Sequence, residues 1–176
     1  MNLPTIEKTD YVYRGKIIDV SVSQVRTAGG VPAQIEMVHH PGGAAALPLF
    51  ADNTVILVRQ YRYPMRRMSL ELPAGRMEPG QSAMQTAARE LEEETGYRAS
   101  TLKLIAAFYP TPGFCQEKLF VYLATELTQT RQNLDVDEEI ELVRIPLIDA
   151  VNMVNVGEID DAKTIIALLH AERMVK

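Results

Sequence analysis

Alternating and continuous apolar segments predict that most of the chain forms β-strands. Tyr11 and Tyr13 alternate with polar residues and the alternation resumes at Ile18, so Gly15 is the expected break between two strands. The run from Ala44 to Phe50 is apolar throughout, which is typical of a strand buried on both faces. The predicted strands cover residues 9–26, 32–40, 44–50, 54–61, 102–109, 117–124 and 139–145, with turn signals such as Ala28-Gly29-Gly30 between them.

Helices are predicted in the middle and at the end of the chain. The segment Ala83–Thr95 contains no Gly or Pro, Ser82 and Gln85 form a capping-box pattern at its start, and Gly96 is expected to end it. The other predicted helices cover residues 146–155 and 161–175. The order of many strands, one helix, further strands and late helices indicates the α+β class.

The middle helix carries an unusual arrangement of acids. At about 100° per residue, one narrow stripe is expected to face the core, and it holds Met84, Ala87, Ala88, Leu91 and Thr95. Glu90, Glu93 and Glu94 fall on the opposite side at spacings i, i+3 and i+4, where like charges repel. Acids at the carboxyl end of a helix also oppose its dipole, and Arg89 offsets only part of this repulsion.

Two interpretations of these acids follow from the residues alone. The helix presents either a solvated acidic face, which is the common case for a run of charges, or a site for a hard divalent cation. Mg²⁺ favours carboxylate oxygen and would remove the conflict between the charges.

Composition and charge narrow the class of protein. The length of 176 residues suits one domain, and a hydrophobic fraction of 47% with 23% charged residues is ordinary for a soluble globular protein. No apolar run reaches the length of a membrane span, and the first residues lack the apolar centre of a signal peptide. The net charge of −5 disfavours a nucleic-acid surface, so we expect neither a membrane nor a nucleic acid as partner.

Cysteine and histidine do not suggest catalytic roles. The single cysteine, Cys115, excludes an intramolecular disulfide and suits a reducing cytoplasm. His39 and His40 are adjacent in a predicted strand, so their side chains point to opposite faces and cannot chelate one metal ion. We interpret both, together with His170, as structural or exposed.

The segment before the middle helix contains candidates for binding phosphate and metal. Arg62 and its basic neighbours Arg66 and Arg67 form either an ordinary charged surface or a clamp for a diphosphate, because guanidinium forks match phosphate oxygens. The exposed carbonyl of Ala74 is a candidate metal ligand, and Gly75 allows close approach of the backbone, although a plain turn explains both equally well.

The segment from Gly75 to Tyr97 resembles the box of the Nudix hydrolase family, Gx5Ex7REUxEExGU with U a bulky aliphatic residue. The fixed positions match in spacing except two, because Gln81 replaces the first Glu and Tyr97 the final U. The resemblance implies an α/β/α sandwich with a mixed central sheet. It also implies a loop-helix-loop that holds Mg²⁺, with Mn²⁺ as the alternative, against a nucleoside diphosphate linked to another group.

Further segments narrow the resemblance to the ADP-ribose pyrophosphatase group. They are Gln60-Tyr61-Arg62, Glu71-Leu72-Pro73-Ala74-Gly75, Pro112, Glu117, the acidic loop of Asp135, Asp137, Glu138 and Glu139, and Gly157 to Thr164. This resemblance implies hydrolysis of a nucleoside diphosphate sugar, with ADP-ribose giving AMP and ribose 5-phosphate. It further implies a homodimer in which residues 1–42 form an antiparallel strand region for dimerisation and substrate contacts, followed by a hydrolase domain over residues 43–176.

The resemblance also implies roles for individual residues. The metal ligands are expected to be the Ala74 carbonyl, Glu90, Glu94 and Glu138, with Glu139 as the alternative to Glu138. The catalytic set is Arg89, Glu90, Glu93, Glu94 and Glu138, and the substrate contacts are Arg62, Glu71, Gly113 and Glu117.

Two departures leave alternatives open. The family's acid at position 81 usually pairs with the box arginine, so Gln81 predicts reduced or retuned activity. The chain has no tryptophan to stack on a base, so Tyr11, Tyr13 or Phe114 would have to do so. The alternatives are a hydrolase of another nucleotide sugar such as GDP-mannose, and a Nudix-fold sensor that binds ADP-ribose without cleaving it.

Overall fold

The computed structural model describes residues 2–136 and 138–175, so Asp137 of the predicted acidic loop lies outside the described residues. The chain divides into two compact units. The first comprises residues 2–42 and 109–118, and the second comprises the described residues of 43–108 and 119–175. The roles in dimerisation and substrate contact expected of residues 1–42 stay predictions.

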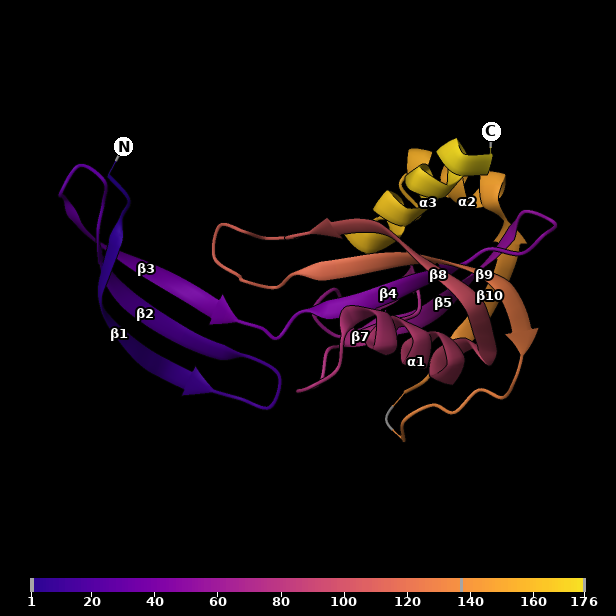
Figure 1. The fold of residues 1–176 in the computed structure, drawn as a ribbon, viewed down its shortest axis with the longest axis horizontal. Helices are drawn as coiled ribbons and strands as arrows, with labels where there is room; N and C mark the ends of the chain where they lie inside the picture. Colours follow the sequence, from indigo (N-terminus) through magenta and orange to yellow (C-terminus); the bar gives the residue numbers. More distant parts are fainter. Residues whose placement is uncertain (1, 137, 176) are drawn as a thin grey trace. The chain divides into compact units, whose positions relative to one another are not determined.

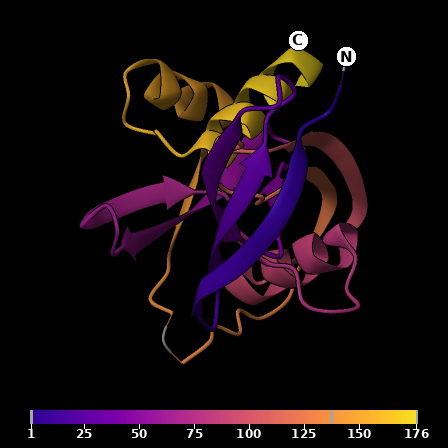
Figure 2. The same ribbon diagram turned by 90° about the vertical axis from the view of Figure 1, so that its left-hand side faces the viewer.

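The first unit is an antiparallel sheet, whose strands lie side by side in Figure 2. They are β1 (Thr5–Arg14), β2 (Asp19–Arg26) and β3 (Pro32–His39), in that order. The predicted break at Gly15 is confirmed, because this residue begins the turn between β1 and β2 and its amide donates to the Ile18 carbonyl. The segment 109–118 joins the free edge of β3 through hydrogen bonds of Val38 with Phe114 and Gln116.

Two sheets form the centre of the second unit. The mixed sheet has the order β7 (Ala74–Arg76), β4 (Gly43–Pro48), β9 (Leu119–Gln129) and β8 (Tyr97–Phe108). Within it β4 and β9 run parallel, and the other neighbours are antiparallel. The antiparallel sheet has the order β10 (Glu141–Pro146), β5 (Thr54–Arg62) and β6 (Arg67–Glu71).

Helices cover both sides of the mixed sheet (Figure 1). Alternate residues of β4 serve the two sides: Ala44 and Ala46 pack with α1 (Ala83–Thr95), whereas Ala45 and Leu47 join the larger core with β5, β6, α2 (Leu147–Asn155) and α3 (Ala162–Val175). The small alanine side chains allow α1 to lie close to the sheet. The predicted α+β class and the α/β/α arrangement with a mixed sheet are therefore confirmed.

The main differences from the predicted elements concern strands. Residues 67–71 and 74–76 form β6 and β7, which the sequence pattern did not predict, and β8 and β9 are both longer than expected. The strand β6 is exposed at its start and buried at its end, and β7 has only three residues, so neither shows an alternation long enough to detect. Among the described helices, none is long and apolar enough to cross a membrane.

Candidate active site

The helix α1 has the predicted bounds and caps. Ser82 is its N-cap, and both hydrogen bonds of the capping box with Gln85 are present. Gly96 ends the helix in the left-handed conformation at φ 69°, where its amide donates to the Glu92 carbonyl. The position of the acids near the end of α1 is thus determined by local sequence.

The predicted orientation of this helix is wrong in part. Met84 is 50% exposed and Thr86 is fully buried, so the buried face is rotated relative to the expected stripe. Glu90 and Glu94 are also buried, at 8% and 3% exposure, so these two acids do not form a solvated face. Ala87 and Leu91 are buried as expected.

The backbone of β7 lies directly over the buried acids. A side chain on Gly75 would place its Cβ 1.8 Å from Glu90 Oε1 and would therefore displace the Glu90 carboxylate. The amide of Ala74 donates to Glu94 Oε2 at 3.2 Å. Close approach of the backbone at Gly75, which the sequence predicted, is therefore confirmed.

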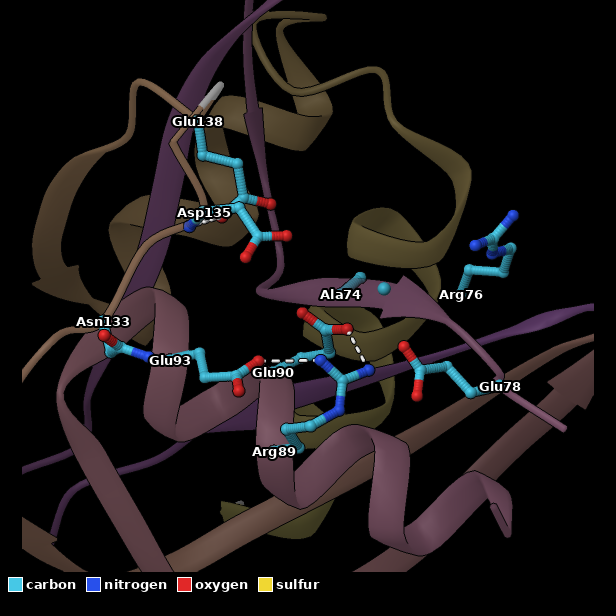
Figure 3. Close-up of a pocket in the computed structure, with 10 residues that line it drawn as sticks. Ala74, Arg76, Glu78, Arg89, Glu90, Glu93, Asn133, Asp135 and Glu138 are labelled. Carbon is cyan, nitrogen blue, oxygen red and sulfur yellow. Dashed lines mark hydrogen bonds and ion pairs between the residues drawn. The ribbon is translucent and has the colours of Figure 1, made fainter. Parts of the chain in front are cut away.

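Arg89 is the cation that pairs with the acids at the mouth of the site. Its guanidinium donates from Nη2 to Glu90 Oε1 and from Nη1 to Glu93 Oε2, both at 2.7 Å (Figure 3). Within the described part of the chain, the buried Nε of Arg89 has no hydrogen-bond acceptor. Arg89 thus pairs with Glu90 and Glu93 through its terminal nitrogens only.

The acids raise one another's pKa. Burial raises the pKa of Glu94 to about 8, and the negative charges of Glu90 and Glu138 add to this effect, against a smaller lowering by the Ala74 amide and Arg62. Burial also raises the pKa of Glu90, which Arg89 opposes and Glu93 and Glu138 reinforce. The site therefore brings together more carboxyl groups than its own cations keep ionised.

The loop after β9 is fixed to the carboxyl end of α1. Three donors from this loop reach helix-end carbonyls: Thr130 N to Gly96 O at 2.7 Å, Gln132 Nε2 to Glu94 O at 2.7 Å, and Asn133 N to Glu93 O at 2.8 Å. The loop continues to Asp135 and Glu138, where the Glu138 carboxylate accepts from the Asp135 amide at 3.1 Å. Asp135 and Glu138 thereby lie above the helix acids Glu90 and Glu93 (Figure 3).

These elements enclose a polar pocket of about 200 Å³ (Figure 3). Its lining residues are Ala74, Gly75, Arg76, Glu78, Arg89, Glu90, Glu93, Asn133, Asp135 and Glu138. The pocket brings together the predicted residues of β7, α1 and the acidic loop, while Glu94 lies buried beside Glu90 and Ala74. Sequence reasoning assigned no site role to Arg76, Glu78, Asn133 and Asp135, because only the folded loops bring them to the pocket.

The donor set of the pocket suits a hard divalent cation. The carboxylates of Glu90 and Glu94, whose pKa values are raised, lie beside the start of β7 at Ala74. Carboxylate and carbonyl oxygens are the ligands that Mg²⁺ and Mn²⁺ prefer. Among residues 2–136 and 138–175, no group of at least three Asp, Glu, His or Cys side chains is arranged closely enough to hold a metal ion. The ion pairs of Arg89 with Glu90 and Glu93 take up carboxylate oxygens in this arrangement.

Comparison with known families identifies the family of this chain. The sequence profile of the NUDIX domain matches residues 39–168, which is most of the chain. This chain belongs to the Nudix hydrolase family. Proteins of this family generally act with a divalent metal ion, in agreement with the oxygen-rich pocket.

Named relatives cover nearly the whole Nudix chain. An ADP-ribose pyrophosphatase of Bacillus subtilis (strain 168) is 41% identical over 170 residues, which is 96% of this chain and 91% of the relative. A protein called methanol dehydrogenase activator, from Bacillus methanolicus, is 34% identical over 94% of this chain and 90% of its own length. A crystal structure of an ADP compounds hydrolase has the same fold, with a TM-score of 0.87 at 24% identity over 99% of this chain and 95% of the other.

The unusual residue of the Nudix box, Gln81, bonds to its own neighbours. Its Oε1 accepts from Thr86 Oγ1 at 3.3 Å, and its Nε2 donates to Glu78 Oε2 at 3.2 Å. The family's acid at this position usually pairs with the box arginine, whose Nε has no acceptor among the described residues of this chain. The described partners of Gln81 are thus Glu78 and Thr86, and its expected effect on activity stays a prediction.

Arg62 and Glu71 form a bidentate ion pair in the second unit. Arg62 donates from Nε to Glu71 Oε1 at 2.7 Å and from Nη2 to Glu71 Oε2 at 2.6 Å. The buried Lys163 donates to the same Oε2 at 2.6 Å. Arg62 is also close enough to Glu94 to lower the pKa of that carboxyl. Arg67, one of the two basic neighbours considered for the same clamp, instead pairs with Asp160.

The two remaining candidates belong to the first unit of the Nudix chain. Gly113 lies in the loop after β8, where a Cβ would meet no atom within 4 Å. Glu117 faces His40, with 3.5 Å between Oε1 and Nδ1. His39 bonds through Nε2 to Ser21 Oγ at 2.7 Å, so both histidines have local partners. The substrate contacts of Gly113 and Glu117 stay predictions.

Proposed function

We propose that this Nudix protein hydrolyses the diphosphate bond of a nucleoside diphosphate sugar, and that its substrate is ADP-ribose, which gives AMP and ribose 5-phosphate. The observation that carries this proposal is the buried pair Glu90 and Glu94 beneath the β7 backbone, of which Arg89 pairs only with Glu90 while burial disfavours the charged form of Glu94. Substrate class rests on the relative named ADP-ribose pyrophosphatase, which matches nearly the whole chain.

We assign Mg²⁺ to this site, with Mn²⁺ as the alternative, and Glu90, Glu94, Glu138 and the Ala74 carbonyl as its ligands. When bound, the ion neutralises phosphate oxygens and stabilises the leaving phosphate. With a pKa of about 8, the Glu94 carboxyl is mostly protonated near neutral pH, and a bound cation would take the place of its proton. Glu93 acts through Arg89, which it shares with Glu90 at 2.7 Å.

The protein's own groups then direct the attack of water. Glu138, on the loop above the buried acids, accepts a proton from the attacking water, with Glu139 as the alternative base. The oxygen of that water bonds to phosphorus, the bridging P–O bond breaks, and the second phosphate leaves as a monoester. Arg62, which is 39% exposed at its side chain, supplies a guanidinium fork to the diphosphate. Gly113 and Glu117 complete the proposed set of substrate contacts together with Glu71, whose side chain is only 4% exposed and therefore serves the diphosphate through its ion pair with Arg62.

We further propose that the chain is a cytoplasmic homodimer that binds no nucleic acid. The acidic net charge and the single cysteine support this assignment. For the dimer, the support is β1, an edge strand in which every residue is exposed, including Ile6, Val12 and Tyr13. A second copy of the chain would cover these apolar side chains.

A hydrolysis panel tests the proposed reaction. Wild-type protein is incubated with ADP-ribose, GDP-mannose, UDP-glucose, NADH and nucleoside triphosphates, each with Mg²⁺, Mn²⁺ or EDTA, and phosphomonoester products are measured after phosphatase treatment. We expect ADP-ribose to be turned over fastest and EDTA to abolish turnover. Faster hydrolysis of GDP-mannose would assign that compound as the substrate instead. If no compound is hydrolysed but ADP-ribose still binds in calorimetry, the protein is a sensor.

A further inference from the structure

The buried Lys163, which lies behind Arg62 and Glu71, has no role in the mechanism above. Lys163 on α3 donates from Nζ to Glu71 Oε2 at 2.6 Å and to Asp161 Oδ1 at 3.0 Å. The side chains of Glu71 and Lys163 are only 4% and 9% exposed, whereas that of Arg62 is 39% exposed. The two buried charges thus stand behind one cation that reaches solvent.

Lys163 lies where a positive charge is costly. It is the second residue of α3, and the amino end of a helix already carries partial positive charge. Burial of its ammonium adds a desolvation cost, and buried ion pairs are often no more stabilising than well-packed apolar residues. Stability alone therefore does not account for a lysine at this position.

The backbone at this position is held independently of Lys163. Thr164 Oγ1 accepts from the Leu72 amide at 2.8 Å, and Asp161 Oδ2 caps the helix by accepting from the Thr164 amide at 3.0 Å. The segment that leads from Glu71 to Ala74 is therefore fixed to α3 by Thr164. What Lys163 adds is a contact to the Glu71 carboxylate itself.

We propose that Lys163 is a positioning residue that acts on the substrate's diphosphate through Glu71 and Arg62. By binding Glu71 Oε2, Lys163 fixes the carboxylate plane, and the two hydrogen bonds from Nε and Nη2 then fix the Arg62 fork. Lys163 also offsets part of the negative charge that Glu71 and Asp161 place near Arg62, which has further N–H donors on Nη1 for phosphate oxygens. This inference rests on the proposed function, because the diphosphate is its ligand.

Steady-state kinetics of Lys163→Met with ADP-ribose test the inference. We expect KM to rise about tenfold while kcat changes less than about threefold, because a charge-assisted contact to the bound diphosphate is weakened. The Mg²⁺ concentration for half-maximal rate should stay at the wild-type value. A purely structural role would reduce the folded fraction and the melting temperature and would leave KM unchanged.

A double-mutant cycle with Arg62 makes the test specific. In an Arg62→Ala background, Lys163→Met should leave KM unaltered, because the residue through which it acts is gone. Lys103→Met removes an exposed lysine from β8 and serves as the matched control with wild-type kinetics. If Lys163→Met fails to fold, Lys163→Gln replaces it, since its amide still donates to Glu71, and KM should rise by a smaller factor.

Each outcome separates the inference from the proposed function. A wild-type protein that neither cleaves nor binds nucleoside diphosphate sugars overturns both proposals. If the wild type only binds ADP-ribose, the same cycle is measured as Kd by calorimetry with the same expectation. Two results with an active wild type overturn the positioning role alone. One is an unchanged KM in folded Lys163→Met, and the other is an equal effect of Lys163→Met on KM with Arg62 and with Arg62→Ala. The ¹⁵N signal of the Arg62 Nε–H gives a readout without substrate, and it should shift in Lys163→Met but not in Lys103→Met.

Discussion

At the scale of single residues, the site depends on acids whose surroundings oppose their charge. Glu94 is 3% exposed, and its pKa rises to about 8 because burial and the nearby acids Glu90 and Glu138 disfavour the anion. A group in such a position destabilises the empty protein and gains most from a cation. This arrangement is the physical basis for the proposal that the site binds a divalent metal ion.

Gln81→Glu should raise kcat for ADP-ribose roughly three- to tenfold. Arg89 Nε has no acceptor among the described residues, and a carboxylate at position 81, the usual partner of this arginine in the family, would supply a charge-assisted hydrogen bond and steady the contacts of Arg89 to Glu90 and Glu93. The measurement is kcat beside the wild type. Gln85→Glu is the matched control, since it adds the same charge within the capping box and leaves the pocket untouched. Equal rates for Gln81→Glu and wild type would remove the proposed effect of Gln81.

Single residues were predictable from sequence where local geometry determined them. The spacing of Glu90 and Glu94 and the need for glycine at Gly75 follow from the chain within one loop and one helix. The burial of Thr86 and the exposure of Met84 do not, because they depend on which strands the helix packs against. For the same reason the sequence pattern wrongly placed the buried Glu90 and Glu94 on the side of the helix opposite the core.

At the scale of elements, the site forms where three of them end. The helix α1 supplies the acids, β7 covers them, and residues 130–133 are fixed to the helix end by hydrogen bonds to the carbonyls of Glu93, Glu94 and Gly96. The caps made α1 predictable, since both lie within a few residues of the helix. The strands β6 and β7 and the Lys163–Glu71 contact were not predictable, because their partners are distant in sequence, 92 residues in the case of this contact.

The link between β6 and α3 predicts how stability depends on pH. Burial alone would raise the pKa of Glu71, but the hydrogen bonds and charges of Arg62 and Lys163 outweigh it and lower the pKa from 4.5 to about 2. Because the folded-state pKa is the lower one, the stabilisation is complete above the unfolded pKa and is lost as the pH falls from about 4.5 through about 2. The shift corresponds to roughly 3 kcal/mol at neutral pH.

Glu71→Gln should therefore lower the free energy of unfolding by about 3–5 kcal/mol at pH 7, since it leaves the buried Lys163 without its carboxylate. The difference from wild type should shrink as the pH approaches about 3. Urea unfolding at several pH values measures this, with the exposed Glu141→Gln as a control expected to lose less than about 1 kcal/mol. A difference that stays constant with pH would contradict the assigned charge pair.

At the scale of the whole molecule, the exposed apolar residues of β1 predict association. Sedimentation should give twice the 19.6 kDa of one chain for the wild type. Val12→Asp should yield monomers, because it places a charge among the side chains that the second copy covers, whereas Val156→Asp, at an equally exposed position after α2, should not. A monomeric wild type, or a Val12→Asp dimer of unchanged affinity, would contradict the proposed dimer.

The central claim is that the buried acids of α1 carry hydrolysis, and one comparison of kcat/KM tests it most directly. Glu94→Gln and Glu92→Gln remove one charge each from the same helix, but Glu92 lies outside the pocket and pairs with Arg98 on the surface. With ADP-ribose and Mg²⁺, Glu94→Gln should lose at least about 100-fold in kcat/KM, and Glu92→Gln should stay within about twofold of wild type. Comparable activity of Glu94→Gln and Glu92→Gln would contradict the account.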